Sequence, residues 1–226
     1  APALRREVVE LQERLERSRM LERAGEYDEA AAMVAEVLRG AEAIGWSPLI
    51  AEARLLGASV QIQQAQYASA EATLEAVMLQ ATSGGEDRIA AEAASRMTFA
   101  VGEGLGRPEE GVRWGRLALA LLRRIGEDDS VAASDTFAVL GIVEEGRGRL
   151  TEALHYKERA LTLRERALGP DHPSVGTAYN LLGVNHLVRG DVSAALRAHE
   201  RGLAIRRAAL GPDHLEVGSS LLNLGN

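Results

Sequence analysis

The chain has 226 residues, a formal net charge of −7, no cysteine and only 4% aromatic residues. The lack of cysteine excludes disulfides and thiolate chemistry, and the negative charge argues against nucleic-acid phosphates as partners. No apolar run approaches the ~20 residues that span a membrane, and the first residues do not read as a signal peptide. We therefore expect a cytoplasmic protein with a core of Ala, Leu and Val, and no nucleic-acid or membrane partner.

One sequence unit recurs along the chain. The segment 168–172 reads Leu-Gly-Pro-Asp-His and returns 42 residues later, at 210–214. A second marker is a small residue, then Tyr or an aliphatic residue two positions on, then a small residue three further on. It begins at Gly25, Ala65, Gly106, Gly148 and Gly190, in steps of 40, 41, 42 and 42. A fixed period of this length is typical of a solenoid, whose units bury their apolar faces by stacking on their neighbours.

In chain order, each marker separates two helical patterns. The first predicted helix of the chain carries an apolar stripe from Leu4 to Leu15. Later predicted helices include 175–188, which precedes a marker, and 151–168, which follows one. We expect helix N-caps three residues after the marker glycines, at Asp28, Thr151 and Ser193. Glycines such as Gly45 and Gly169 should end the second helices in a left-handed conformation.

These patterns predict an all-α fold: a solenoid of antiparallel helix hairpins with five units and a partial sixth. The units are 3–44, 47–83, 86–126, 128–169, 171–211 and 213–226, and we expect them to form one domain over residues 1–226. Because the chain lacks an initiator Met and stops midway through a unit, we expect it to be part of a longer protein.

The markers resemble the tetratricopeptide repeat (TPR). Gly-x-Tyr-x-x-Ala at Gly25–Ala30 is similar to the most recognisable core of that family. The 42-residue unit with Leu-Gly-Pro-Asp-His resembles the extended class of kinesin light chains and many bacterial regulators. That class reads Leu-Asn-Asn-Leu-Ala in its first helix, and here Tyr179–Gly183 and Leu221–Gly225 each keep one of the two asparagines.

The resemblance implies a right-handed superhelix whose concave face, lined by the first helices, binds peptides or proteins. It implies a scaffold and not an enzyme, with no cofactor or metal. The alternative is a regulatory or sensor region of a bacterial kinase, NTPase or transcription regulator.

Two motifs allow other interpretations. His172 and His214, with Asp171 and Asp213, could be metal ligands, but packed helices are roughly 8–10 Å apart and zinc ligands lie about 2 Å from the metal. Helix capping is therefore favoured, with Asp171 and Asp213 as the expected caps. Gly102-x-Gly104-x-Gly106 resembles a phosphate-binding loop, which must follow a strand, whereas a helix precedes it here. We interpret these glycines as close helix packing in a weakened third unit, and expect residues 99–116 to open first.

Repeated arginines and one pair of positions carry further expectations. Arg159 and Arg201, and likewise Arg164 and Arg206, are one unit apart; they could form a basic ladder for an anionic partner, but a structural role is favoured. The positions four residues before and nine after each marker should touch across the hairpin. They predict a Glu144–Lys157 ion pair, which uses the single lysine of the chain, and a His186–His199 contact.

The binding surface is expected on the groove face of the first helices. Shifts of 42 residues align rows that place exposed aliphatic side chains in one concavity, which is typical of a surface with a partner. The candidate residues are Arg96, Ala100, Glu103, Ile142, Glu145, Asn180, Leu181, Val184, Leu187, Asn223 and Asn226.

Their chemistry predicts the kind of partner. Asparagines such as Asn180 and Asn223 can both donate to and accept from a peptide backbone. Because Arg96 is the sole basic candidate, we expect no capture of a C-terminal carboxylate. We expect an extended peptide with apolar anchors, neutral or basic in charge; the alternative occupant is a further domain of the same chain.

Overall fold

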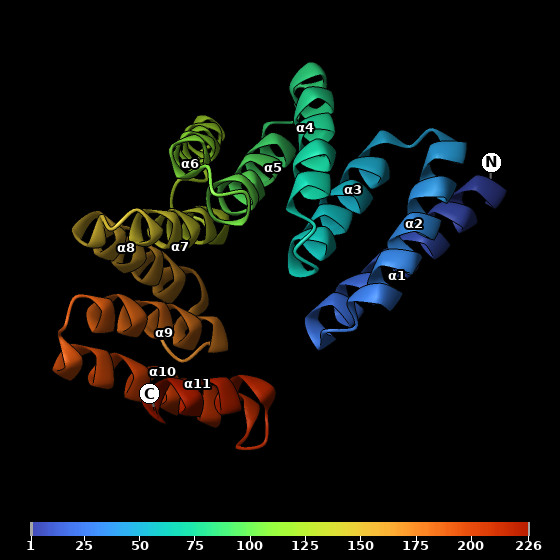
Figure 1. Cartoon of the computed structure of the whole chain (residues 1–226). Helices are drawn as coiled ribbons and strands as arrows, with labels where there is room; N and C mark the ends of the chain where they lie inside the picture. Colours follow the sequence, from blue (N-terminus) through green and yellow to red (C-terminus); the bar gives the residue numbers. More distant parts are fainter. Residues whose placement is uncertain (1, 226) are drawn as a thin grey trace.

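The computed structural model describes residues 2–225, with side chains from Leu4 onward, and those residues form helices without any strand (Figure 1). The helices are α1 (Pro2–Ala24), α2 (Tyr27–Ile44), α3 (Ser47–Gln63), α4 (Tyr67–Gly84), α5 (Asp87–Phe99), the π-helix η1 (Ala100–Gly104), α6 (Pro108–Arg124), α7 (Val131–Gly146), α8 (Leu150–Leu168), α9 (Pro173–Val188), α10 (Val192–Leu210) and α11 (Leu215–Gly225). They make five hairpins followed by a single helix, so the predicted all-α repeat solenoid is confirmed.

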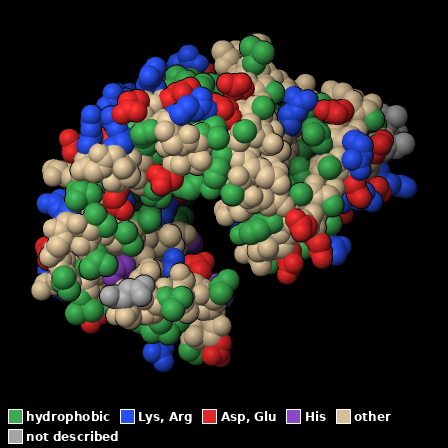
Figure 2. Space-filling view, in the orientation of Figure 1, with side chains coloured by type: hydrophobic (Ala, Val, Ile, Leu, Met, Phe, Trp, Pro, Cys, Tyr) green, Lys and Arg blue, Asp and Glu red, His purple; other side chains and the backbone are tan. Residues whose placement is uncertain are grey.

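Each helix packs on the next one along the chain, and the first helices of successive hairpins also pack on one another, most closely α5 on α7. This stacking bends the chain into an arch whose two arms face each other (Figure 1). Figure 2 shows the hollow between the arms, and shows Lys and Arg side chains beside Asp and Glu over the outer surface. The core consists mainly of Ala, Leu and Val, such as Leu15, Leu74 and Leu140, as the composition predicts.

The predicted N-cap residues lie two positions after the N-caps that the structure shows. The second helices α2, α8 and α10 begin at Tyr27, Leu150 and Val192, so Asp28, Thr151 and Ser193 lie inside the first turn. In α10 the cap is Asp191, whose carboxylate accepts from the Ala194 amide at 2.9 Å. The second helix therefore begins sooner after the marker glycine than the positions of the polar residues predict.

The helix ends agree better with the sequence. Gly45 is left-handed at the end of α2, with φ 71° and ψ 27°. Gly169 also has a positive φ, but its ψ of 155° is extended and directs the chain into the Pro-Asp-His turn. In that turn His172 Nδ1 accepts from the Ser174 amide, and His214 repeats this contact with Glu216, each at 3.2 Å. The helix caps are thus the histidines and not the expected Asp171 and Asp213.

The glycine-rich stretch of the third unit is where helix α5 passes into the π-helix η1. Gly111 of α6 crosses there so closely that a Cβ on it would lie 2.5 Å from the Cα of Gly102. Close helix packing is therefore confirmed, and early opening of residues 99–116 stays a prediction.

The π-helix adds one residue and so changes the register of α5. Met97 and Leu140, both fully buried, are 43 residues apart, and the same shift relates Glu92 to Asp135 and Arg96 to Val139. The 42-residue alignment of Arg96 with Ala138 and Asn180 is therefore wrong.

Candidate functional site

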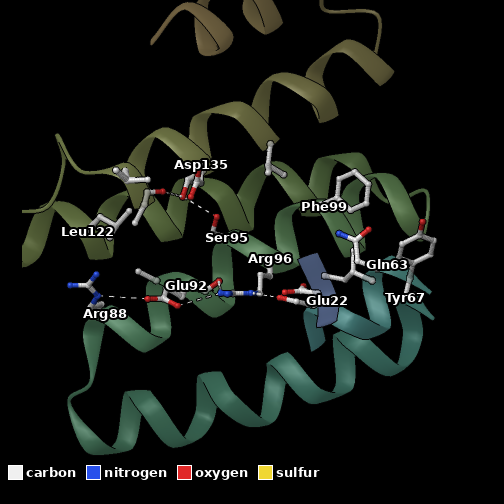
Figure 3. Close-up of a pocket in the computed structure, with 17 residues that line it drawn as sticks. Glu22, Gln63, Tyr67, Arg88, Glu92, Ser95, Arg96, Phe99, Leu122 and Asp135 are labelled. Atoms are coloured by element: carbon white, nitrogen blue, oxygen red, sulfur yellow. Dashed lines mark hydrogen bonds and ion pairs between the residues drawn. The ribbon is translucent and has the colours of Figure 1, made fainter. Parts of the chain in front are cut away.

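The first helices enclose a cavity of about 740 Å³ on the concave side of the arch. Its walls come mainly from α3, α5 and α7, with Glu22 of α1, Tyr67 of α4 and Leu122 of α6 at its margins (Figure 3). A second hollow of about 590 Å³ extends it toward α1 and shares Glu22, Arg88 and Arg96. Together they form a continuous groove along the first helices of the N-terminal four units, from α1 to α7, which we call the concave groove.

Arg96 of α5 lies at the centre of the concave groove (Figure 3). Its Nε donates to Ser59 Oγ of α3 at 2.8 Å, and a terminal nitrogen donates to the Glu92 carboxylate at 3.4 Å. Glu92 also pairs with Arg88 at 3.7 Å, and Arg88 forms a second ion pair with Glu127 at 2.9 Å. This row of alternating charges ties α5 to α3 while leaving about a third of the Arg96 and Glu92 side chains exposed.

Two further carboxyl groups face the groove. Burial raises the pKa of Glu22, and the Arg96 guanidinium partly offsets this effect. On the opposite wall, burial against the surrounding helices raises the pKa of Asp135, which Arg164 partly offsets, although the Asp135 side chain remains 58% exposed. Both carboxyl groups therefore lie where a further positive charge would be favourable.

The other end of the cavity is largely apolar. Ile62, Tyr67, Phe99 and Val139 line it together with Gln63 (Figure 3), and the Tyr67 and Phe99 rings meet edge to face with centroids 6.3 Å apart. A Cβ on Gly104 would lie 2.4 Å from the Tyr67 ring. The glycine of the π-helix thus makes room for the aromatic side chain that closes this end.

The structure corrects two of the expected contact residues and changes the role of a third. Ala100 is fully buried, and Asn180 is 7% exposed; its amide donates to Ser220 Oγ at 2.9 Å, so neither residue can contact a peptide. The Glu145 side chain is 17% exposed and pairs with Lys157 at 2.5 Å. Asn185 donates to the same Glu145 oxygen at 2.9 Å. These polar groups stabilise the contact between units.

The remaining candidates are accessible to different degrees. Arg96 lines the cavity, Glu103 is exposed, and Ile142, Leu181 and Asn223 are partly exposed. Val184 is 36% and Leu187 43% exposed, so an apolar strip continues from Val139 along α7 and α9. Asn226 lies outside the described residues.

Sequence reasoning missed Ser59, Tyr67, Glu92, Phe99 and Asp135, which line the cavity. The extra residue of η1 shifts every α5 position before it, so the 42-residue alignment paired Ile142 with the buried Ala100 in place of Phe99. The acidic residues Glu92 and Asp135, 43 residues apart in neighbouring units, were a signal in the sequence for the true register.

The repeated arginines are structural, as favoured from the sequence. Arg159 pairs with Asp129 at 2.7 Å, and Arg201 repeats this one unit later with Asp171 at 3.6 Å. Arg164 and Arg206 are both only 6% exposed and bind groups within the chain. A basic ladder on the outer face is therefore neutralised by the chain itself.

The predicted Glu144–Lys157 ion pair is wrong. Lys157 pairs with Glu145, while Glu144 accepts from Arg147 at 3.0 Å. A Cβ on Gly141 would lie 2.7 Å from Cγ of Lys157. The lysine stem therefore lies across the helix at Gly141, and this path directs its ammonium past Glu144.

The single hydrogen-bond partner of His199 is Asn180, not His186, within the described residues. Its Nδ1 lies 3.4 Å from Asn180 Oδ1. The ring packs on Gly183, where a Cβ would lie 2.5 Å away, just as Lys157 packs on Gly141. Burial lowers the pKa of His199.

Two other features are absent from the described residues. No group of three or more His, Cys, Asp or Glu side chains there is arranged to hold a metal ion. None of their helices combines the length and apolarity needed to cross a membrane.

Comparison with known proteins identifies the repeats. Residues 100–166 and 135–208 match the family model for the tetratricopeptide repeat. No curated protein matches the sequence.

Several solved structures share the fold. BtubC (BKLC) from P. vanneervenii has a TM-score of 0.68 and 20% identity over 99% of this chain and 82% of that one. A thermophilic TPR protein of Thermus thermophilus has a TM-score of 0.67 and 19% identity over 94% of this chain and 99% of that one. The TPR-like repeats of a putative kinesin light chain of Podosopora anserina have a TM-score of 0.64 and 17% identity over 88% of this chain and 95% of that one.

Proposed function

Because the chain is a tetratricopeptide repeat protein, we propose that it is a binding scaffold that holds an extended peptide segment of a partner protein in the concave groove. Proteins of this family are generally scaffolds without catalytic activity, and we propose the same for this chain. We also propose that it works in the bacterial cytoplasm, in signalling. The alternative of a regulatory or sensor region has no specific observation in its favour.

The observation that carries the proposal is the groove itself. A hollow of about 740 Å³ combines an apolar end at Ile62, Phe99 and Val139 with polar groups that converge on Arg96. Such a combination is typical of binding sites, in which apolar walls supply affinity and a few polar groups fix orientation. The apolar strip through Val184 and Leu187 would extend the contact along the arch.

The charges of the groove favour a partner of a particular kind. Arg19, Arg23, Arg88 and Arg96 line the two hollows together with Glu22, Glu52, Glu92 and Asp135. Because the four positive charges balance the four negative charges, the lining as a whole is neutral. A neutral lining favours a peptide that is neutral or carries few charges. Capture of a free C-terminal carboxylate is not expected, because Arg19, Arg88 and Arg96 already pair with glutamates.

The test is selection of random peptides on the 226-residue chain, followed by measurement of dissociation constants for the selected sequences. Val139→Asp introduces a charge at the apolar end of the cavity and should weaken binding at least about tenfold, or about 1.4 kcal/mol. Arg116→Glu, an exposed position on the second helix α6, is the matched control and should bind as the wild type does. Circular dichroism would confirm that both variants fold.

Two outcomes would overturn the proposal. One is that no selected peptide binds the chain. The other is that Val139→Asp has no effect while substitutions of Arg159 and Arg201 on the second helices abolish binding.

A further inference from the structure

The hollow between α5 and α7 lies at a place where the next two units carry a buried arginine. The second helices α6, α8 and α10 place Leu122, Arg164 and Arg206 at equivalent positions, each 42 residues after the last. Leu122 lines the cavity, whereas Arg164 and Arg206 fill the corresponding spaces of their units. The cavity therefore coincides with a leucine in this arginine series.

The two arginines make equivalent hydrogen bonds. Arg164 binds the Asp135 carboxylate of its own unit and donates to the main-chain oxygen of Ser174 in the next unit at 3.4 Å. Arg206 donates to Thr177 Oγ1 at 2.9 Å and to the main-chain oxygen of Glu216 at 3.0 Å. Each guanidinium thus bridges two consecutive first helices, and we call this arrangement the arginine clamp.

The third unit has the acceptors of the arginine clamp without its guanidinium. Glu92 is equivalent to Asp135 once the extra residue of η1 is counted, and Ala132 is equivalent to Ser174; both line the cavity. The Glu92 carboxylate makes long contacts, at 3.4 Å and 3.7 Å, with Arg96 and Arg88. The Ala132 carbonyl oxygen accepts from Thr136 Oγ1 at 2.9 Å and has the position that Ser174 uses to bind Arg164.

The charge of this region also has room for a cation. The carboxylates of Glu22, Glu92 and Asp135 line the cavity. Burial raises the pKa of Glu22 and of Asp135, and the neighbouring guanidinium groups offset this effect only in part, so a further guanidinium beside them would be favourable.

We propose that the hollow between α5 and α7 binds an arginine side chain of the partner peptide, which supplies the guanidinium that the chain itself supplies at Arg164 and Arg206. The inference rests on the proposed function, because it names the side chain that the groove selects. A planar guanidinium can bridge a carboxylate and a carbonyl oxygen in a fixed geometry, which a lysine ammonium matches less well.

The test compares fluorescent peptides Ala-Val-Arg-Val-Ala and Ala-Val-citrulline-Val-Ala by fluorescence anisotropy. Citrulline has nearly the shape of arginine but no charge. The arginine peptide should bind at least about tenfold more tightly, equivalent to about 1.4 kcal/mol, and a lysine peptide should be intermediate. Equal affinity of the arginine and citrulline peptides, or no binding of the arginine peptide, would overturn the inference.

Variants locate the effect. Leu122→Arg should supply the missing guanidinium from within the chain and abolish the preference for arginine over citrulline. Glu92→Gln removes the charged acceptor and should reduce the preference, which keeps the test valid if Leu122→Arg fails to fold. Glu152→Gln, exposed on α8, is the matched charge control and should keep the full preference.

The outcomes separate this inference from the proposed function. If library-selected peptides bind and are weakened by Val139→Asp, but the preference for arginine is absent or persists in Leu122→Arg, the scaffold function stands and the arginine site is wrong. If no peptide binds at all, both proposals are wrong.

Discussion

The third unit differs from the two units after it in how the two helices of its hairpin pack together. At one position of the second helix the three units carry Gly115, Lys157 and His199. In the third unit Gly115 admits Leu140 from the next unit, since a Cβ there would lie 2.5 Å from that side chain. In the later units Lys157 and His199 lie across glycines of their own first helix instead.

The difference shows how a repeat protein gains a site. Leu122 lines the hollow between α5 and α7 in the third unit, at the position where the next two units carry an arginine. The buried side chains of Arg164 and Arg206 fill the equivalent space in the fourth and fifth units. The cavity therefore lies where the arginine clamp is replaced by a leucine.

The largest expected effect comes from breaking the backbone contact of the third unit. In Gly111→Ala the new Cβ would lie 2.5 Å from Gly102 Cα and 2.7 Å from the Thr98 oxygen. Because these are backbone atoms, the helices must move apart, and we expect a loss of about 3 kcal/mol in the free energy of unfolding. Urea denaturation measures it.

The control for this change is Gly218→Ala in α11, where nothing lies within 4 Å of the new Cβ. It should be neutral or slightly stabilising, since alanine favours helices. Equal effects of the two substitutions would show that the third unit is not held by close packing at glycine.

A smaller effect is expected from the buried ion pair of the fourth unit. Lys157→Met keeps the side-chain stem but leaves the largely buried Glu145 without its cation, so we expect a loss of about 2 kcal/mol. A double-mutant cycle should give a coupling of about 1 kcal/mol between Lys157→Met and Glu145→Gln. The matched cycle with Glu144→Gln should give almost none; the reverse result would restore the Glu144–Lys157 pair.

The smallest effect is a pH dependence at His199 in the fifth unit. Burial lowers the folded pKa of His199 below its ordinary value of 6.5. Below that value the unfolded chain binds a proton that the folded chain does not, so the free energy of unfolding should fall as the pH drops through about 6.5 and level off at the folded pKa. Urea midpoints at pH 7.5 and pH 5.5 test this.

His199→Gln should lose this part of the pH dependence, whereas His155→Gln, exposed on α8, should keep it. An unchanged pH profile in His199→Gln would mean that the buried ring does not resist protonation.

Much of the fold could be predicted from the sequence because the repeat fixes it. The markers at Gly25 and Gly148 have the positive φ that their turns require, and the aliphatic positions form the core. The site could be predicted only in part. Arg96 and the Val184 strip were found. Asn180 was assigned to the groove because a 42-residue shift placed it in the row of Arg96, and that shift cannot reveal the extra residue of the π-helix; in the structure Asn180 is buried. Side-chain paths over Gly141 and Gly183 also depend on contacts that spacing does not encode.

The concave groove is proposed to bind a peptide segment at α5 and α7. An amide NMR titration of the 226-residue chain with a library-selected peptide tests this binding directly. We expect the largest shifts on concave positions such as Glu92, Arg96, Asp135 and Val139. Largest shifts on the second helices, for example around Arg159 and Arg201, with the concave positions unchanged, would contradict it.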